Sequence, residues 1–192
     1  VFDGATRFFR GKRMDGNWES PFNPLAVGRA YTEATAWQYR FFVPHDVNGM
    51  IQLFGGKEEF VAALDDIFNT DAEIHGNLVD ITGLIGQYVH GNEPSHHIAY
   101  LYNYVGEPWK TQKMSRRLLN EMYHPTPEGI IGNEDCGQMS AWYILSSMGL
   151  YSVCPGSNEY VLTTPLFEKV VVHLANGRTL TCLLYTSPSP RD

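Results

Sequence analysis

Hydrophobic periodicity is clearest at residues 57–69, KEEFVAALDDIFN. Apolar side chains recur there at three- and four-residue spacing, which predicts an amphipathic α-helix with one buried face. The expected core residues of this helix are Phe60, Ala63, Leu64, Ile67 and Phe68.

Capping residues predict two shorter helices before this one. Thr32 can cap a helix over residues 36–42, which would stop before Pro44. Asp46 can cap a second helix, which would end at the glycine pair 55–56. Residues 1–31 are rich in Gly, Pro, Asn and Asp, which predicts a loop with a short helical lead-in.

The helical pattern continues after residue 69. Residues 78–89, LVDITGLIGQYV, predict a turn followed by a short helix, and Pro94 suits the first position of the next helix, which would extend to residue 105. Residues 111–123 predict another amphipathic helix. Residues 137–148, GQMSAWYILSSM, are apolar nearly all round, which predicts a deeply buried helix.

The pattern changes after residue 158. Residues 159–182 alternate between polar and apolar, carry β-branched side chains and include the Asn176–Gly177 turn signal, so they predict a hairpin. The chain is therefore expected to be mainly α, with a short β hairpin or sheet element at its end. The last ten residues, 183–192, run into a Ser/Pro-rich end and are predicted to be a non-native or disordered tail.

Composition excludes several classes of protein. The net charge of -7 and the absence of a basic cluster argue against nucleic-acid binding. Cys136, Cys154 and Cys182 form no CxxC pair, which excludes zinc-ribbon and thioredoxin motifs. No apolar run has the length of a membrane span. Because the chain begins with Val1, the lack of a signal peptide says nothing about export.

Residues 90–97, HGNEPSHH, contain three histidines but do not suit zinc. His96 and His97 are adjacent, so on a helix they diverge, whereas zinc sites on helices use histidines four residues apart. Asn92 and Glu93 offer oxygen ligands, which suit a hard cation such as calcium. The alternative is capping: with Pro94 as the first helical residue, Glu93 falls at the N-cap, although Glu is not a favoured cap.

Two further carboxyl groups have both a structural and a catalytic interpretation. Asp135 and Gln138 have the spacing of a capping box, but a carboxylate fixed at a helix N-terminus also suits a general base. Glu33 would lie in the first turn of a helix, where it complements the helix dipole, or where neighbouring aromatic rings raise its pKa as in a general acid. Trp37 could line a pocket, or pack in the core.

Four blocks together resemble the signature blocks of glycoside hydrolase family 92, the calcium-dependent exo-acting α-mannosidases. The blocks are residues 31–56, 90–112, 129–157 and 160–167, and they occur in the order of the family. The resemblance implies an N-terminal β-sandwich followed by an (α/α)6 barrel. The chain is then expected to be a fragment: residues 1–155 form part of the barrel catalytic domain and 156–182 a small β element, while the N-terminal sandwich is missing.

The resemblance also implies roles for the carboxyl groups. The family inverts the anomeric centre, which requires two carboxyls about 6.5–9.5 Å apart with a water between them. By resemblance, Glu33 is the general acid and Asp135 the general base. Asn133 is a helper where relatives often carry Asp, and Ala34–Thr35 replaces the Gly-Asn pair of many relatives.

The implied cofactor is Ca2+, with Asn92 and Glu93 as the metal residues. Glu93, His90 and Trp37 are the expected substrate contacts, and Glu93 is the alternative acid. The implied substrates are α-mannoside glycans, in particular α-1,2-linked mannose of N-glycans, and the full-length protein is expected to be secreted, periplasmic or at the cell surface. The fragment alone is expected to be inactive. The alternative function is a non-catalytic carbohydrate-binding or interaction module.

Overall fold

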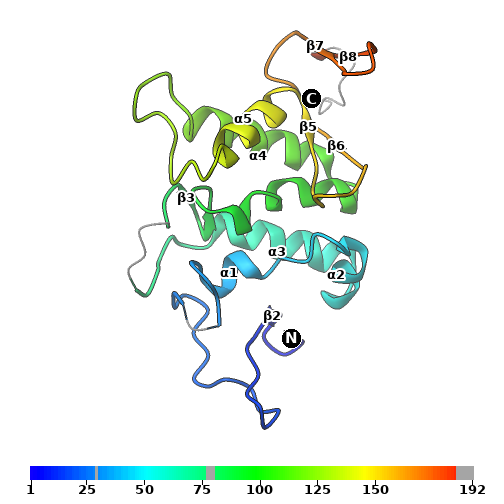
Figure 1. Cartoon of the computed structure of the whole chain (residues 1–192). Helices are drawn as coiled ribbons and strands as arrows, with labels where there is room; N and C mark the ends of the chain where they lie inside the picture. The colour runs from blue at the N-terminus through cyan, green and yellow to red at the C-terminus, as the bar shows by residue number, and fades with distance from the viewer. Residues whose placement is uncertain (29, 77–80, 185–192) are drawn as a thin grey trace. The chain divides into compact units, whose positions relative to one another are not determined.

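The computed structural model describes residues 1–28, 30–76 and 81–184 (Figure 1). This part of the chain is mainly α-helical with short two-stranded sheets, as the sequence predicts. Its internal contacts divide it into two compact units. Unit 1 comprises residues 1–98 and 131–133, and unit 2 comprises residues 99–130 and those that follow 133. Within the described residues, no helix is both long and apolar enough to cross a membrane.

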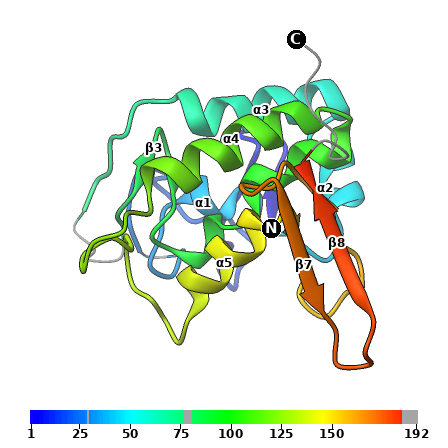
Figure 2. The ribbon, with the colours of Figure 1, turned by 90° about the horizontal axis from the view of Figure 1, so that it is seen from above.

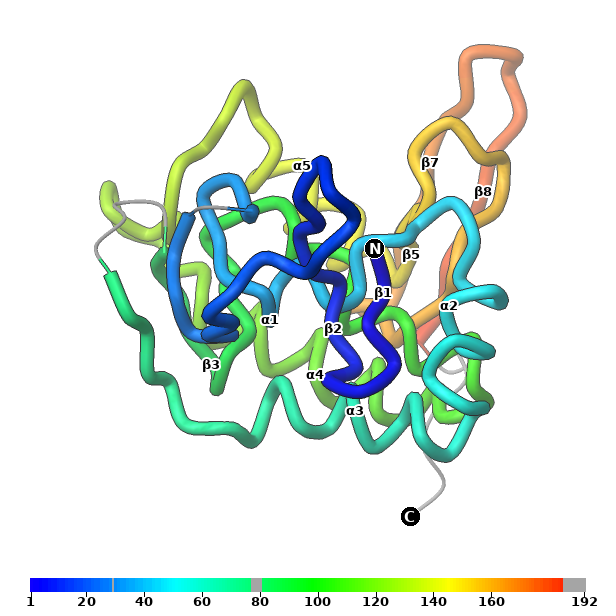
Figure 3. The backbone as a smooth tube through the Cα atoms, turned by 90° about the horizontal axis from the view of Figure 1, so that it is seen from below, coloured from blue at the N-terminus to red at the C-terminus, as the bar shows by residue number. Residues whose placement is uncertain are grey.

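Unit 1 consists of two small hairpins and three α-helices. Strands β1 and β2 pair antiparallel near the N-terminus (Figure 3), and β3 pairs antiparallel with β4. The elements are β1 Phe2–Asp3, β2 Phe8–Phe9, α1 Ala36–Tyr39, α2 Val47–Leu53, α3 Lys57–Asn69, β3 Leu84–Ile85, β4 Tyr88–Val89 and the 3-10 helix η1 Glu93–Ser95. The helical lead-in predicted for residues 1–31 is therefore wrong, since β1 and β2 form there.

The helices of unit 1 follow their local signals with one correction. Asp46 caps α2 by accepting a hydrogen bond from the Gly49 amide, and α3 buries the five predicted core residues. Helix α1 is shorter than predicted, and its N-cap is Thr35, not Thr32. Thr35 forms a capping box with Gln38, whose side-chain oxygen accepts from the Thr35 amide at 2.7 Å. A capping box satisfies two helix-end groups at once, which favours the later start.

A hairpin replaces the turn and short helix predicted over residues 78–89. Residues 78–80 lie outside the described residues, and residues 84–89 form β3, a tight turn and β4. Gly86 occupies the turn at φ 58°, and a Cβ atom there would lie 2.6 Å from the Ile67 carbonyl oxygen at the end of α3. The Gln87 amide also donates to that oxygen at 2.7 Å. The close approach to α3 thus requires glycine and fixes the hairpin.

An aromatic cluster forms the core of unit 1. Phe41, Phe54 and Phe60 are almost completely buried, and their ring centroids lie 5.3–5.7 Å apart. Edge-to-face and offset contacts at such distances are favourable for aromatic rings. The cluster joins α2, α3 and the segment after α1, and so it holds the chain that leads out of the Glu33 loop.

Unit 2 contains two α-helices and two further strand pairs. Its elements are η2 Ile98–Val105 (whose first residue belongs to unit 1), α4 Pro108–Glu121, α5 Gln138–Ser147, β5 Leu150–Tyr151, β6 Val161–Leu162, β7 Lys169–His173 and β8 Thr179–Leu183. The predicted hairpin is confirmed: β7 and β8 pair antiparallel (Figure 2), and Gly177 in their turn has φ 80°.

Helix α5 is buried on one face only. Trp142 is 1% exposed and its ring stacks on Tyr123, whereas Ile144 is 56% exposed. The prediction of a helix buried all round is therefore wrong, because the described residues of unit 2 cover the Trp142 face and leave the Ile144 face open. The tail was predicted from residue 183, but Leu183 is the last residue of β8, so the predicted start is wrong. Residues 185–192 of the predicted tail lie outside the described residues.

Candidate functional site

The loop that carries Glu33 is held by its backbone. The Glu33 carbonyl oxygen accepts a hydrogen bond of 2.6 Å from the Asn92 side-chain amide, and the Ala34 carbonyl oxygen accepts one of 3.2 Å from the Gly28 amide. Thr35 then starts α1 with its capping box. Ala34 and Thr35 are buried, but Glu33 is exposed. The loop therefore fixes the Glu33 backbone while its carboxyl group remains open to solvent.

Glu33 also has an unfavourable backbone conformation. Its φ angle is 55°, in the left-handed region that disfavours residues with a Cβ atom. Among the described residues, the non-glycine positions with positive φ are Arg7, Glu33, Asp135 and Cys136. Both predicted catalytic carboxyl groups are thus at such positions. Strained backbone of this kind concentrates at functional sites.

Asn92, not Glu93, is the N-cap residue of η1. The Asn92 side-chain oxygen accepts from the Glu93 amide at 3.1 Å, so the prediction that Glu93 falls at the N-cap is wrong. Asn is a favoured cap and Glu is not, which explains the shift by one residue. Asn92 is 4% exposed and its other end binds the Glu33 loop, while Glu93 is half-buried.

A contact between two glycines brings Asn133 to the same part of unit 1. Gly132 has φ 75°, and a Cβ atom added to it would lie 2.6 Å from both the Cα and the carbonyl oxygen of Gly91. These glycines directly precede Asn133 and Asn92, so their backbones meet at the start of two predicted site segments. The structure therefore places Glu33, Asn92, Glu93 and Asn133 on neighbouring segments of unit 1. Sequence reasoning missed the contact between the two glycines. The available clue was that each glycine directly precedes a predicted polar site residue.

Asp135 belongs to unit 2 and lies before α5. Asp135, Cys136 and Gly137 have consecutive φ angles of 43°, 58° and 91°, and Gly137 is the N-cap residue of α5. The predicted capping box between Asp135 and Gln138 is wrong, because the helix starts only at Gln138. The backbone turns sharply instead, and the Gln138 amide donates to the Asp135 carbonyl oxygen at 3.2 Å. The Asp135 side chain is exposed.

All three histidines are buried, and His90 and His96 belong to one hydrogen-bonded network. Nδ1 of His90 lies 2.8 Å from the Tyr88 hydroxyl, and Nε2 of His96 lies 2.9 Å from the His90 carbonyl oxygen. Nε2 of His97 donates to the Phe41 carbonyl oxygen at 2.8 Å. Burial lowers the pKa of His90 to about 3, and the pKa values of His96 and His97 to about 4. All three are therefore neutral near pH 7.

This network favours a packing role for His90. Its ring is fully buried, so in this structure it does not reach solvent. A substrate contact by His90 stays a prediction. Across residues 1–28, 30–76 and 81–184, no three His, Cys, Asp or Glu side chains form a group that could hold a metal ion.

Trp37 packs in an aromatic cluster with Phe8. Its half-buried ring meets the Phe8 ring edge-on at 5.1 Å, and the Arg40 guanidinium lies 5.1 Å from its centroid. Its indole Nε1 is buried without a hydrogen-bond partner. The packing role is thus observed, and a substrate contact stays a prediction.

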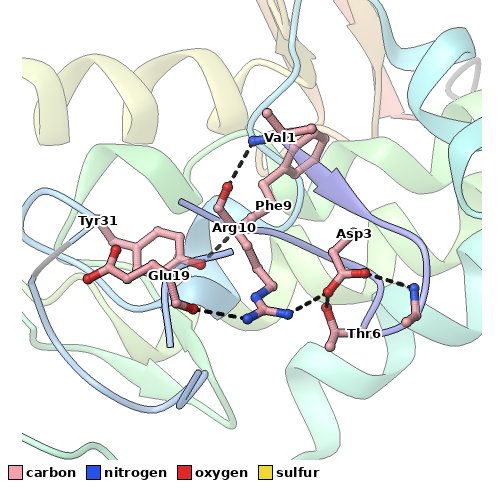
Figure 4. Close-up of polar contacts among 8 residues, drawn as sticks. Val1, Asp3, Thr6, Phe9, Arg10, Glu19 and Tyr31 are labelled. Carbon is pink, nitrogen blue, oxygen red and sulfur yellow. Dashed lines mark hydrogen bonds and ion pairs between the residues drawn. The ribbon is translucent and has the colours of Figure 1, made fainter. Parts of the chain in front are cut away.

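Sequence reasoning also missed a polar centre around Arg10 (Figure 4). The guanidinium donates to the Asp3 carboxylate at 2.7 Å and to the Glu19 carbonyl oxygen at 3.0 Å, and it lies 4.5 Å from the Phe22 ring centroid. The hydrogen bond from Arg10 lowers the pKa of Asp3. The Tyr31 hydroxyl donates to the Phe9 carbonyl oxygen at 2.6 Å.

A cavity of about 250 Å³ lies beside Arg10, with Glu19, Phe22 and Tyr31 among its lining residues. It borders the segment that precedes Glu33. No motif pointed to this cavity, because its residues carry no periodic signal.

Residues 1–188 match the family model of the glycosyl hydrolase family 92 catalytic domain. The chain belongs to glycoside hydrolase family 92. The predicted family resemblance is thereby confirmed.

The chain is also similar to solved structures of family 92 and to a curated glycosidase. A family GH92 α-mannosidase of Bacteroides thetaiotaomicron has a TM-score of 0.85 and 43% identity, and the match covers 95% of this chain and 23% of that one. An inverting family GH92 mannosidase of the same organism has a TM-score of 0.80 and 37% identity, with 94% and 26% covered. An uncharacterized secreted glycosidase of Arthroderma benhamiae is 35% identical over 190 residues, with 93% and 23% covered. The chain thus spans about a quarter of the length of these relatives.

Proposed function

We propose that this chain is part of an exo-acting α-mannosidase that hydrolyses α-linked mannose of glycans with inversion. The observation that carries the proposal is the convergence in unit 1: Asn92 binds the Glu33 backbone at 2.6 Å, and the Gly91–Gly132 contact brings Asn133 beside the same segment. The naming of one solved relative as an α-mannosidase and of another as an inverting mannosidase supports it. We further propose that the helices belong to an (α/α)6 barrel.

In this proposal Glu33 is the general acid and Asp135 the general base. Glu33 donates its proton to the leaving glycosidic oxygen as the bond to the anomeric carbon breaks. Asp135 removes a proton from the water that attacks the opposite face of that carbon. Both side chains are exposed and both have left-handed backbone, which is the kind of strain found at functional sites. Asn133 helps to orient the water, and Glu93, Trp37 and His90 are the proposed substrate contacts.

The proposed cofactor is Ca2+. Calcium takes about six to eight oxygen ligands, and the half-buried Glu93 carboxylate is chemically suited to be one of them. Asn92 was predicted as the second, but its oxygen already accepts from the Glu93 amide. The other ligands would come from the rest of the full-length protein, from water and from sugar hydroxyls. When bound, the cation would engage mannose hydroxyls and favour a distorted ring.

The proposed substrates are α-1,2-linked mannosides of N-glycans. We also propose that the full-length protein acts outside the cytoplasm, which the naming of one relative as secreted supports. Catalysis would require the N-terminal domain that the resemblance implies, so the chain alone is expected to be inactive.

The test uses the full-length protein with an α-1,2-linked mannobiose. We expect Glu33→Gln and Asp135→Asn each to lower kcat by a factor of about 10²–10⁴, and proton NMR to show β-mannose as the first product. Removal of calcium with EDTA should abolish turnover, and added calcium should restore it. Wild-type turnover in Glu33→Gln would refute the acid assignment. Mannose binding by calorimetry without any turnover would instead indicate a carbohydrate-binding module.

A further inference from the structure

We propose that Asn92 is a positioning residue, which holds the Glu33 backbone so that the Glu33 carboxyl group faces the leaving group, and that Asn92 does not bind the calcium. This inference rests on the proposed function, because it takes Glu33 as the general acid. It differs from the role that the sequence predicts for Asn92, which is that of a metal residue beside Glu93.

The hydrogen bonds of Asn92 define the orientation of its side-chain amide. The Glu33 carbonyl oxygen can only accept, so the Asn92 group 2.6 Å from it is the NH2 donor. The Glu93 backbone amide can only donate, so the group 3.1 Å from it is the Asn92 oxygen. Both ends of the amide are thus engaged by backbone groups on opposite sides. If the amide were flipped, the Asn92 oxygen would face the Glu33 carbonyl oxygen and the Asn92 NH2 group would face the Glu93 amide. Neither hydrogen bond could then form.

This orientation does not suit a calcium ligand. A ligand directs a lone pair of its oxygen at the cation, but the Asn92 oxygen already uses one of its two lone pairs on the Glu93 amide, and the end directed at the Glu33 loop carries partial positive charge. Asn92 is also only 4% exposed, which leaves little of its surface for a cation. The neighbouring Glu93 is half-buried and has a carboxylate, the ligand type that calcium prefers.

Glu33 needs such a contact because of its backbone. A φ of 55° is disfavoured for a residue with a Cβ atom, so neighbouring groups must hold it. The Thr35 capping box holds the chain after Glu33, and Asn92 binds Glu33 itself. Loss of the Asn92 donor would allow the peptide to relax and the carboxyl group to move. A displaced acid transfers its proton less efficiently, since general acid catalysis depends on hydrogen-bond reach.

The test uses the Asn92→Ser and Asn92→Asp variants of the full-length protein. Serine is a favoured N-cap residue but is too short to reach Glu33, and aspartate keeps the accepting oxygen but lacks the donor. The matched control is Asn176→Ser, since the Asn176 oxygen also accepts from a nearby amide, that of Arg178, in the β7–β8 turn. Each variant is assayed on mannobiose and on 2,4-dinitrophenyl α-mannoside, and its calcium Kd is measured by calorimetry.

The two substrates have different leaving groups, and the comparison between them distinguishes a misplaced general acid from a general loss of structure at the site. Dinitrophenolate leaves without a proton, so a misplaced acid slows mannobiose hydrolysis and spares the aryl mannoside. We expect both Asn92 variants to lower kcat on mannobiose about tenfold or more, with little change on the aryl substrate, in KM or in calcium Kd. The control should match the wild type.

Three results would overturn the inference. Weaker calcium binding by Asn92→Ser, or tighter calcium binding by Asn92→Asp, would show that Asn92 is a calcium ligand. Equal losses on both substrates would make its role merely structural. Wild-type kcat in both variants would remove the role altogether. The Glu33→Gln variant distinguishes these outcomes from failure of the proposed function: if it retains mannobiose turnover, then Glu33 is not the acid, whatever Asn92 does.

Discussion

The contact between Gly91 and Gly132 is expected to be essential for the site, and the change Gly132→Ala tests it. The added methyl group would lie 2.6 Å from the Gly91 Cα and carbonyl oxygen, whereas carbon atoms in favourable contact are about 3.5–4.0 Å apart. Because both neighbours are backbone atoms, no side-chain rotation can relieve the overlap. The segments before Asn133 and Asn92 must therefore separate.

The magnitude follows from two contributions. Gly132 has φ 75°, where a residue with a Cβ atom costs about 1–2 kcal/mol. Overlap with fixed neighbours adds about 1–3 kcal/mol, as in other overpacked positions. Gly132→Ala should thus destabilise by about 2–5 kcal/mol. Gly16 provides the control, because its φ is 82° and a Cβ atom there would meet nothing within 4 Å. Gly16→Ala should show only the backbone contribution, about 1–2 kcal/mol.

The assay compares the two variants in the full-length protein. Thermal unfolding gives the loss of stability, and amide hydrogen exchange of peptides that cover residues 88–97 and 129–137 shows where it acts. We expect faster exchange in both peptides for Gly132→Ala and not for Gly16→Ala, together with a lower kcat on mannobiose. If Gly132→Ala is no more destabilising than Gly16→Ala, the glycine contact does not hold the two segments together.

Two further changes probe the surroundings of the site. Burial lowers the pKa of His97 from 6.5 to about 4, so below about pH 6.5 the unfolded chain binds the proton first and stability falls until about pH 4. At 1.36 kcal/mol per pKa unit, His97 alone should remove about 2 kcal/mol between about pH 7 and pH 5. In His97→Gln, which retains a donor for Phe41 and cannot titrate, urea unfolding should show a pH dependence that is weaker by about this amount. Thr35→Ala should destabilise α1 by about 0.5–2 kcal/mol in thermal unfolding, and Thr35→Ser should restore most of it.

Local signals predicted most of the helices, and tertiary contacts explain the errors. Asp46 and the apolar stripe of residues 57–69 defined α2 and α3, because caps and periodicity act within a few residues. The β3–β4 hairpin was missed because Gly86 meets the end of α3, a contact that no local pattern records. The open face of α5 at Ile144 was missed because an apolar surface predicts burial only where other residues cover it.

For the candidate site, the sequence predicted which residues are involved but not how the backbone places them. The family blocks identified Glu33 and Asp135 as carboxyl groups of interest, but not their left-handed backbone. They identified Asn92 but not its contact with Glu33, which joins residues 59 positions apart in the chain. A motif records which side chains a site needs. It does not record which backbone atoms hold them, because those contacts depend on how distant segments meet.

Two of the contacts that assemble unit 1 around Glu33 are made to backbone atoms. Asn92 binds a carbonyl oxygen and an amide, and Gly91 meets Gly132 through main-chain atoms. Every residue has these main-chain atoms, so replacement of the outer side chains leaves the contacted groups present. Such a site is sensitive instead to changes that alter φ or add volume at the glycines. Replacements at Gly91 and Gly132 should consequently impair mannobiose turnover more than replacements of the exposed residues around them.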